Sequence, residues 1–307
     1  MCRTLLLAFI LITVVCVGVA AAETDSTADA IESPAVIDEG GKVQNPPNQL
    51  RLKYKYLDGE NQRYQVQIMN RGSYRLLNSS KEQQLDTVTE MFFKQSVKAE
   101  EDGLYKILWS LQSGTVRIPE FGDSVITLPD IVYTTDDRGV IKKVAGLEKL
   151  ALLPGKPQQK SLASIFGQMS FHGFPNKDIK IGDEWEQDYS VAINEKDKIE
   201  AKTRSKLTGY EHYDGYDCAL IETKYSYPLK YEVIDKIHGK LTLEGTESAV
   251  INTRFAYNEG KLIRSEADIK SDAKVTRAGG SADAFVKLEL NVVGLLLPSK
   301  TDAQGGG

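Results

Sequence analysis

A strict alternation of side chains near the C-terminus restricts the fold of this chain more than any other feature. Between Ile263 and Val275, small or apolar residues alternate with six charged ones. A helix would spread these charges around its circumference, whereas a strand places all of them on one face. The segment therefore predicts a strand with one solvated face and one covered face.

The same period of two recurs along most of the chain. Residues 50–56, 64–68 and 286–292 show it clearly, and about ten segments fit a strand in this way. Glycine-containing turns that favour tight hairpins stand between several of them. These turns lie at 58–59, 102–103, 214–215 and 258–260. Because short turns join antiparallel neighbours, the predicted fold is mainly β, a large curved antiparallel sheet or open barrel.

The alternation stops between residues 146 and 176. Apolar residues recur there at helical spacing, and Pro154 ends the first of two expected short helices. Apolar helices within an antiparallel chain are expected to cover an open apolar sheet face, which adds a minor α+β character. The residues expected to contact a ligand are Leu150, Leu153, Ile165, Phe166 and Met169 on this cover, with Met91, Phe93 and Trp109 on the sheet.

The N-terminal residues predict export. Residues 1–22 combine the single charge of Arg3, an apolar middle and an alanine triplet, which is typical of a cleaved secretory signal peptide. The alternative is an uncleaved membrane anchor, because the apolar stretch is close to the length that spans a bilayer. Residues 23–48 lack a periodic apolar pattern and predict a flexible tether.

The remaining chain is expected to form one β-rich domain, residues 49–298, followed by a disordered tail at 299–307. The order of motifs in residues 49–145 is repeated in 177–294, on either side of the helical segment 146–176. This repetition indicates either a duplicated half-sheet or hairpins that look alike because their turns share the same chemistry.

Cysteine and charge content exclude two kinds of partner. Cys2 and Cys16 leave with the signal peptide, so Cys218 remains alone and no disulfide-linked partner is expected. Cys218 stands in an apolar run and is interpreted as a small buried hydrophobe. The net charge is −5 with both signs interspersed, and without a basic block we expect no nucleic-acid partner.

No motif of an enzyme or a metal centre is present. The three histidines lack metal-ligand spacing, and no nucleophile elbow or phosphate-binding loop occurs. His172 lies between aromatic residues, but an ordinary loop histidine is the simpler interpretation. The acidic pairs fit solvated turns better than a calcium loop. We therefore predict no enzyme activity, no cofactor and no metal, with a hydrolase kept as a minor alternative.

Several motifs together resemble a family of bacterial secreted domains of unknown function. The matching stretches are 52–59, 85–91, 137–148 and 174–185, and the likeness extends over about residues 50–275. This resemblance implies no catalytic residues. It implies an architecture similar to periplasmic lipoprotein carriers, in which short helices plug the apolar hollow of a curved antiparallel sheet.

These features predict an exported, non-enzymatic cell-envelope protein, periplasmic or extracellular, or membrane-anchored if the signal is not cleaved. It is expected to bind an apolar ligand, such as a lipid or a lipoprotein acyl chain, in the hollow of the sheet. The alternative is a structural or interaction module at the cell surface. In that case sheet edges or the many aromatic residues would meet an envelope protein or a glycan.

Overall fold

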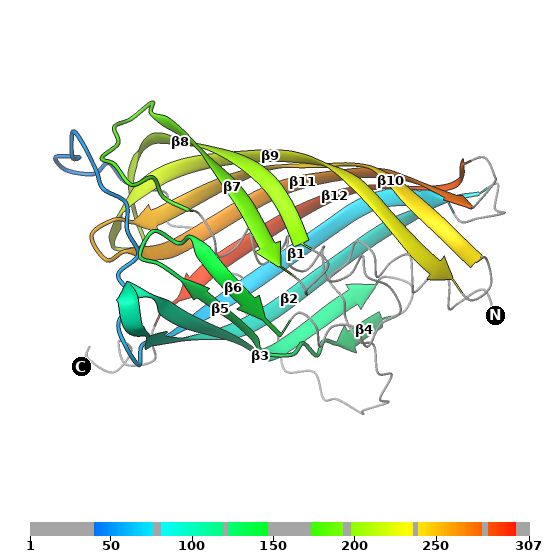
Figure 1. Cartoon of the computed structure of the whole chain (residues 1–307), viewed down its shortest axis with the longest axis horizontal. Coiled ribbons are helices and arrows are strands. Elements are labelled where there is room, and N and C mark those ends of the chain that lie inside the picture. Colours follow the sequence, from blue (N-terminus) through cyan, green and yellow to red (C-terminus); the bar gives the residue numbers. More distant parts are fainter. Residues whose placement is uncertain are drawn as a thin grey trace.

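The computed structural model describes residues 40–75, 81–118, 122–146, 173–192, 198–235, 239–277 and 282–298. One antiparallel sheet of twelve strands dominates this part of the chain (Figure 1). A single 3₁₀ turn, η1 (Glu101–Gly103), accompanies it among the described residues. The strands are β1 (Asn61–Arg75), β2 (Glu82–Ala99), β3 (Tyr105–Ile118), β4 (Gly122–Val125), β5 (Ile131–Thr135), β6 (Ile141–Ala145), β7 (Glu184–Ala192), β8 (Lys198–Tyr213), β9 (Tyr216–Asp235), β10 (Gly239–Ala256), β11 (Lys261–Arg277) and β12 (Ala282–Leu297).

The first and last strands are neighbours near the middle of the sheet. The strand order is β6-β5-β3-β2-β1-β12-β11-β10-β9-β8-β7, with β4 paired to β3 off this path. β1 pairs with β12 from Arg63 opposite Leu297 to Arg75 opposite Phe285. The chain is thus an antiparallel meander whose two ends meet, and its sheet edges are β6 and β7.

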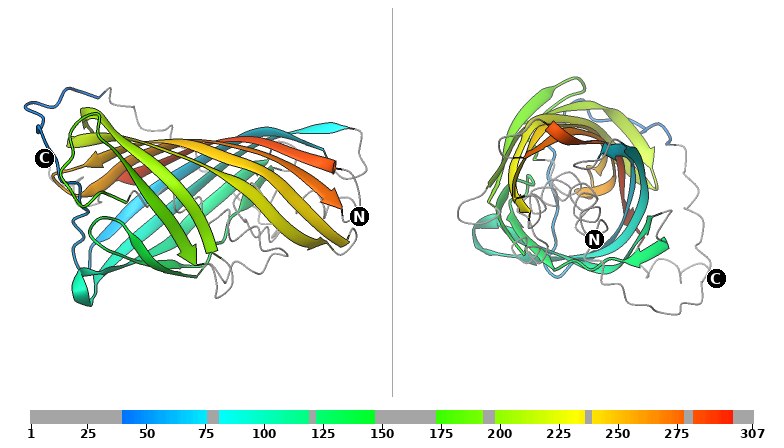
Figure 2. Two further views of the ribbon diagram at one scale, coloured as in Figure 1. Left: turned by 45° about the horizontal axis from the view of Figure 1, so that its top comes forward. Right: turned by 90° about the vertical axis from the view of Figure 1, so that its right-hand side faces the viewer.

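The sheet curls until its two edges come close together. Cα atoms of β6 and β7 approach within 8 Å, yet no ladder joins these strands in the described part of the chain. Seen end-on, the strands surround a common axis (Figure 2). The predicted fold class, a large curved antiparallel sheet or open barrel, is therefore confirmed, with twelve strands in place of about ten. We call the unpaired line between β6 and β7 the seam.

The sheet also splays on the β7 side of the seam. β8 pairs with β9 only from Tyr213 opposite Tyr216 to Thr203 opposite Tyr225. Beyond that point β8 continues with β7, and β9 continues with β10. In Figure 1 the β7–β8 pair turns away from the β9–β10 pair. The described strands consequently enclose one end of the structure more fully than the other.

Side-chain alternation in the strands follows the sequence pattern. On β11 every odd-numbered residue from Ile263 to Val275 is buried. The charged residues between them are exposed or half-buried. Ala267 lies between Ile251 of β10 and Val292 of β12. Small side chains on β11 thus face larger ones on its neighbours, as close packing requires.

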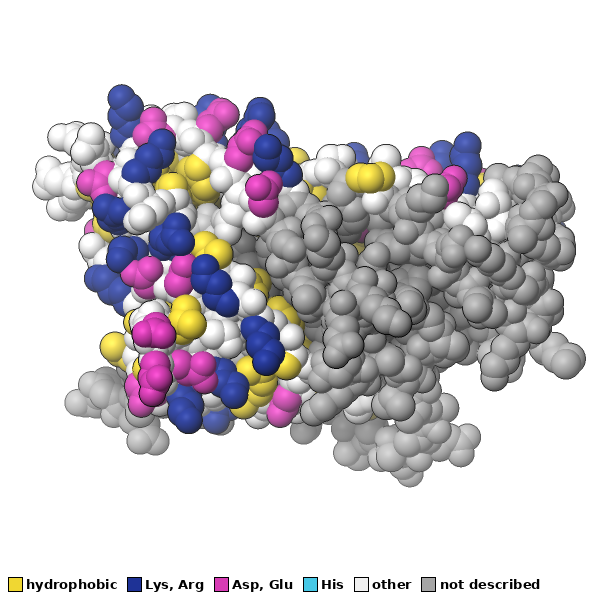
Figure 3. Space-filling model, in the orientation of Figure 1, with side chains coloured by type: hydrophobic (Ala, Val, Ile, Leu, Met, Phe, Trp, Pro, Cys, Tyr) yellow, Lys and Arg dark blue, Asp and Glu magenta, His cyan; other side chains and the backbone are white. Residues whose placement is uncertain are grey.

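The outer face carries charges of both signs. Lys270 lies opposite Glu289 with 3.4 Å between their charged atoms, and Asp272 pairs similarly with Lys287. Figure 3 shows positive and negative side chains interspersed over the described part of one face. Exposed pairs of this kind contribute about 0–1 kcal/mol each, so burial of the inner face stabilises the sheet far more than they do.

Asp-Gly turns form hairpins at two of the expected places. Asp214 and Gly215 have φ values of 50° and 78° and join β8 to β9 as a two-residue turn, as the preference for positive φ requires. Asp102 and Gly103 lie in the loop between β2 and β3. Gly59, with its φ of 77°, joins no hairpin and lies just before β1.

Residues 40–60 cross the more enclosed end of the sheet, and we call them the crossing segment. Residues 51–57 alternate between exposed and buried side chains as predicted, but they form no strand. The backbone hydrogen bonds of the crossing segment go to separate elements instead, which corrects the predicted strand at 50–56. The bonds are Gly41 with His212, Leu50 with Ile179, Tyr54 N–H to the Asp137 carbonyl, Lys55 N–H to the Gly260 carbonyl, and Gly59 N–H to the Val97 carbonyl.

Several domain predictions concern residues outside the described part of the chain. Residues 1–39, the expected helices within 147–172 and the tail at 299–307 all lie outside it. The described ends of the segment 146–176 are not helical. Residues 40–48, the last part of the predicted tether, include the bond between Gly41 and His212. Strands β1 to β6 and β7 to β12 fill opposite sides of the sheet, and the proposed duplication stays a prediction.

Candidate functional site

The concave inner face of the sheet is the candidate ligand surface. Alternate side chains of β1, β2, β3 and β12 are apolar and buried on this face. Tyr64, Val66 and Ile68 of β1 continue into the apolar residues of the neighbouring strands. We call this surface the apolar wall. Its other buried members include Met91 and Phe93 on β2, Ile107, Trp109 and Val116 on β3, and Val286, Leu288, Leu290 and Val292 on β12.

Three of the predicted ligand contacts lie together on the apolar wall. Met91, Phe93 and Trp109 are all buried on the inner face of the adjacent strands β2 and β3. The ring centroids of Phe93 and Trp109 are 5.4 Å apart. The five predicted contacts on the helical cover, Leu150, Leu153, Ile165, Phe166 and Met169, lie outside the described residues. The predicted site as a whole therefore stays a prediction.

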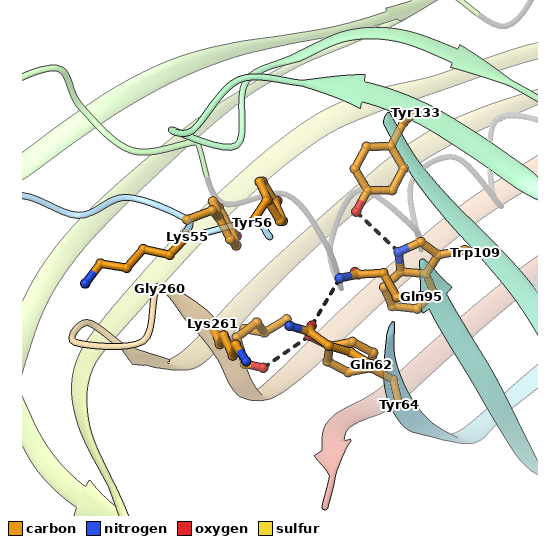
Figure 4. A pocket seen from close by; sticks show the side chains of 11 residues that line it. Lys55, Tyr56, Gln62, Tyr64, Gln95, Trp109, Tyr133, Gly260 and Lys261 are labelled. Atoms are coloured by element: carbon orange, nitrogen blue, oxygen red, sulfur yellow. Dashed lines mark hydrogen bonds between the residues drawn. The ribbon is translucent and has the colours of Figure 1, made fainter. Parts of the chain in front are cut away.

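A hydrogen-bonded network closes the inner face beneath the crossing segment (Figure 4). The side-chain oxygen Oε1 of Gln62 accepts hydrogen bonds from the Tyr64 hydroxyl at 2.8 Å and from the Gln95 side-chain amide at 3.1 Å. The Trp109 indole N–H donates to the Tyr133 hydroxyl at 3.2 Å. The cavity between these groups has a volume of about 10 Å³, room for about one water molecule. This network closes one end and is too tight for a ligand.

Burial keeps the phenols at this end neutral. Loss of solvation raises the pKa of Tyr56 well above its usual value, with the nearby Tyr133 adding to the shift. Burial raises the pKa of Tyr64 in the same way. Both hydroxyls therefore stay protonated, and that of Tyr64 donates its hydrogen bond to Gln62 as a neutral group.

An aromatic cluster fastens the crossing segment to the sheet. Tyr54 stacks on Phe174 at 5.2 Å between ring centroids and meets the edge of Phe255 at 5.1 Å. Phe174 and Phe255 are themselves 4.7 Å apart. Aromatic pairs in such geometries add about 0.5–1.5 kcal/mol each beyond area burial. The cluster joins the crossing segment, residues before β7 and the end of β10 into one packed unit.

Three polar side chains lie buried on the inner face without a hydrogen-bond partner, and we call them the polar patch. Asn70 on β1 is 1% exposed, and Thr87 and Thr89 on β2 are 3% and 1% exposed. Within the described part of the chain, neither polar atom of the Asn70 amide and neither threonine hydroxyl has a hydrogen-bond partner. Sequence analysis missed the patch, although a polar residue at an inward position of a two-residue period was the signal available.

The wall formed by β9 to β11 is more polar. Glu247 on β10 shares its face with Ala249 and Ile251, which are buried. Its carboxylate accepts hydrogen bonds from the Tyr225 hydroxyl at 3.2 Å and the Ser271 hydroxyl at 3.0 Å. Apart from the polar patch and Gln95, the inner face is thus apolar across β12, β1, β2 and β3, whereas on β9 to β11 the polar groups of Tyr225, Glu247 and Ser271 bond to one another.

A groove of about 620 Å³ lies at the edge of the same end of the sheet. Its volume is typical of a small-molecule site, and its lining mixes charges of both signs and amides with the apolar residues Leu296, Leu297 and Pro298. This composition suits a polar partner better than an alkyl chain. The lining includes Glu60, Arg63, Lys94, Asp214, Lys261 and Leu297.

Two of the described side chains with reactive groups, Cys218 and His212, are held by burial or by an ion-pair partner. Cys218 is fully buried, and burial, with Glu211 adding to it, raises the pKa of its thiol to about 12. The exposed His212 lies 2.8 Å from Asp217, its partner across the β8–β9 hairpin. No group of three or more His, Cys, Asp or Glu residues in the described ranges is placed to hold a metal ion.

None of the helices within the described ranges has the length and apolar character needed to cross a membrane.

Comparison with known proteins identifies no family for this chain. No protein-family model and no curated protein matches it. The resemblance to secreted domains of unknown function therefore rests on the quoted motifs alone.

Three solved structures show a distant likeness. A structure describing lipid–protein interactions in lipovitellin matches at 9% identity with a TM-score of 0.42, over 80% of this chain and 26% of that one. DynF, from dynemicin biosynthesis in Micromonospora chersina, matches at 8% identity with a TM-score of 0.22, over 88% of this chain and 94% of that one. A mutant porin of Rh. blastica matches at 9% identity with a TM-score of 0.24, over 78% of this chain and 100% of that one. This chain thus spans about a quarter of the lipovitellin chain, and likenesses this distant carry no argument about function.

Proposed function

We propose that this protein is an exported, non-enzymatic cell-envelope protein that holds the apolar part of a lipid or acyl chain against the apolar wall. The observation that carries the proposal is the direction of the alternation. The buried apolar side chains of β12, β1, β2 and β3 form one cluster on the concave side, while the charged residues of these strands, with a few apolar ones such as Met69 and Val88, lie on the outer face. A continuous apolar surface on the concave side of a curved sheet is the kind of site that binds apolar ligands.

The seam supplies a lateral route to this surface. Among the described residues β6 and β7 share no ladder, so separating these strands would break no ladder hydrogen bond there. The predicted cover residues 147–172 connect these two strands in the sequence, and we retain their five apolar residues as proposed ligand contacts. Export by the N-terminal signal places the protein in the envelope, where lipids and acylated proteins are abundant.

Native mass spectrometry of the purified protein tests the proposal. We expect additional mass that corresponds to bound lipid and is lost after extraction with organic solvent. Val66→Asp and Val292→Asp on the apolar wall should reduce the retained lipid strongly, provided that circular dichroism shows the β-sheet intact. Val125→Asp, at a side chain that is 62% exposed, is the matched control. Wild-type protein free of lipid, and unable to bind it after extraction, would contradict the proposal.

The groove of about 620 Å³ favours a second candidate function. Its charged and amide lining fits a peptide or glycan of the cell surface, so the protein would act as an interaction module. The aromatic residues support this candidate less, because none of them is exposed among the described side chains. Capture of envelope components by the wild type but not by Arg63→Glu/Lys94→Glu would favour it, and equal capture would speak against it.

A further inference from the structure

The polar patch forms one continuous site on two neighbouring strands. Asn70 lies directly opposite Thr87 in the β1–β2 ladder, and Thr89 follows one inward position further along β2, opposite Ile68. Directly opposite side chains such as Asn70 and Thr87 have Cβ atoms about 4.5–5.5 Å apart, and diagonal neighbours such as Asn70 and Thr89 are about 7–8 Å apart, still within reach of longer side chains. One small chemical group can therefore reach all three side chains.

Apolar residues surround this site. Leu290 of β12 lies opposite Asn70 on its other side, and Val116 of β3 lies opposite Thr89. Leu85, the preceding inward residue of β2, is also buried. The patch is thus an isolated polar site within the apolar wall, which makes its missing hydrogen bonds costly.

The side chains of the patch determine the chemistry of the group that would satisfy them. The Asn70 amide offers two donors and one acceptor, and each threonine hydroxyl offers a donor and acceptor sites. The neighbours of the patch in the sheet register carry no charge. A carboxylate or ammonium group placed there would lose its hydration without gaining a counterion. A neutral hydroxyl or carbonyl group matches the patch without this penalty.

We infer that Asn70, Thr87 and Thr89 form a subsite for a neutral hydroxyl or carbonyl group of an otherwise apolar ligand, as in a long-chain alcohol, an acyl ester or an amide. The inference rests on the proposed binding of apolar ligands and defines their chemical class. In the bound state the alkyl part lies on the apolar wall of β12 and β1. At the patch a carbonyl oxygen accepts hydrogen bonds, and a hydroxyl both accepts and donates them.

A matched set of twelve-carbon ligands tests the inference. Diphenylhexatriene, an apolar dye without hydrogen-bonding groups, reports occupancy of the apolar wall, and 1-dodecanol, methyl laurate and dodecane compete with it. The test variant is Asn70→Leu/Thr87→Val/Thr89→Val, which keeps size and removes the polar atoms. The control variant is Thr115→Val, because Thr115 lies exposed on β3.

We expect the wild type and Thr115→Val to bind dodecanol or methyl laurate more tightly, relative to dodecane, than the triple variant does, by about tenfold. The dye should bind all three proteins equally. If the dye binds but this relative preference is unchanged in the triple variant, the inference is wrong and the proposed function stands. If the dye does not bind the wild type, the proposed function itself is contradicted.

Thermal unfolding separates this role from a structural one. Removing unsatisfied buried polar groups should leave the melting temperature of the triple variant equal to that of the wild type or above it. A lower melting temperature would show that the patch has a structural partner and would overturn the inference. Should the triple variant fail to fold, Thr89→Val alone must reduce the relative preference by about threefold, and an unchanged preference overturns the inference.

Discussion

At the scale of single residues, Cys218 shows what the sheet does to a reactive group. Burial raises the pKa of its thiol to about 12, and only the thiolate is a nucleophile. The thiol should therefore react with a maleimide at pH 7.5 at least about 100 times more slowly in the folded protein than in 6 M guanidinium. Comparable rates in both states, measured by mass spectrometry, would show that the thiol is accessible and not merely a small hydrophobe.

Asp136 is a residue-scale determinant of stability against acid. Burial opposes its charge, but hydrogen bonds from the backbone N–H of Val140 and from Arg138 outweigh burial and lower the pKa of Asp136. A lowered pKa in the folded state gives stability that is present above the unfolded pKa of about 3.9 and lost as the pH falls through the folded value.

Asp136→Asn should therefore lower the free energy of unfolding at pH 7, and the difference from the wild type should shrink below about pH 4. Urea denaturation between pH 2.5 and 7 measures it. Asp214→Asn is a control for loss of an exposed turn charge, since Asn also tolerates the positive φ of that turn. A difference for Asp136→Asn that grows as the pH falls would mean that the folded protein raises the pKa of Asp136 instead of lowering it.

At the scale of elements, the β8–β9 hairpin isolates the contribution of turn geometry. Gly215 has a φ of 78°, and an added Cβ there would meet no atom within 4 Å. Gly215→Ala should lower the free energy of unfolding by about 1–2 kcal/mol through backbone strain alone. Gly209→Ala is the control, because Gly209 has no positive φ and an added Cβ there would lie 3.8 Å from Leu220 Cδ1, an ordinary contact distance. Equal effects of the two substitutions would rule out strain as the cause.

The crossing segment depends on its aromatic cluster. Phe255 is fully buried and contacts both Tyr54 and Phe174. Phe255→Ala should lower the free energy of unfolding by about 3–5 kcal/mol and increase amide hydrogen exchange in residues 50–56. Leu57→Ala, at a side chain that is 64% exposed, should change stability by less than about 0.5 kcal/mol. Unchanged exchange in Phe255→Ala would mean that the backbone bonds alone hold the segment.

At the scale of the whole molecule, β12 joins the two halves of the sheet. It pairs with β1 on one side and β11 on the other. A chain ending at Arg277 would lack it and expose two long unpaired edges, which promote aggregation. We expect this truncation to lose the cooperative unfolding transition in circular dichroism, while a chain ending at Pro298 keeps every described strand and should retain the transition. Cooperative unfolding of the shorter chain would show that the halves fold independently.

Local alternation made the fold class predictable, because a two-residue period such as that of 263–275 reports which face of a strand is buried. It could not show that residues 51–57 leave the sheet, since a crossing extended segment buries alternate residues as a strand does. Asn70, Thr87 and Thr89 come together only through the β1–β2 register. Such register is a property of two strands and is not contained in either one.

The pairing of β1 with β12 also has a consequence for biosynthesis. Arg63 meets Leu297, so the ribosome must translate more than 200 residues between these partners before the central ladder can form. Until then the apolar face of β1 to β3 and the edge of β1 stay exposed and unpaired in the nascent chain, which favours aggregation. We therefore expect a chaperone that binds unfolded chains to raise the yield of folded protein.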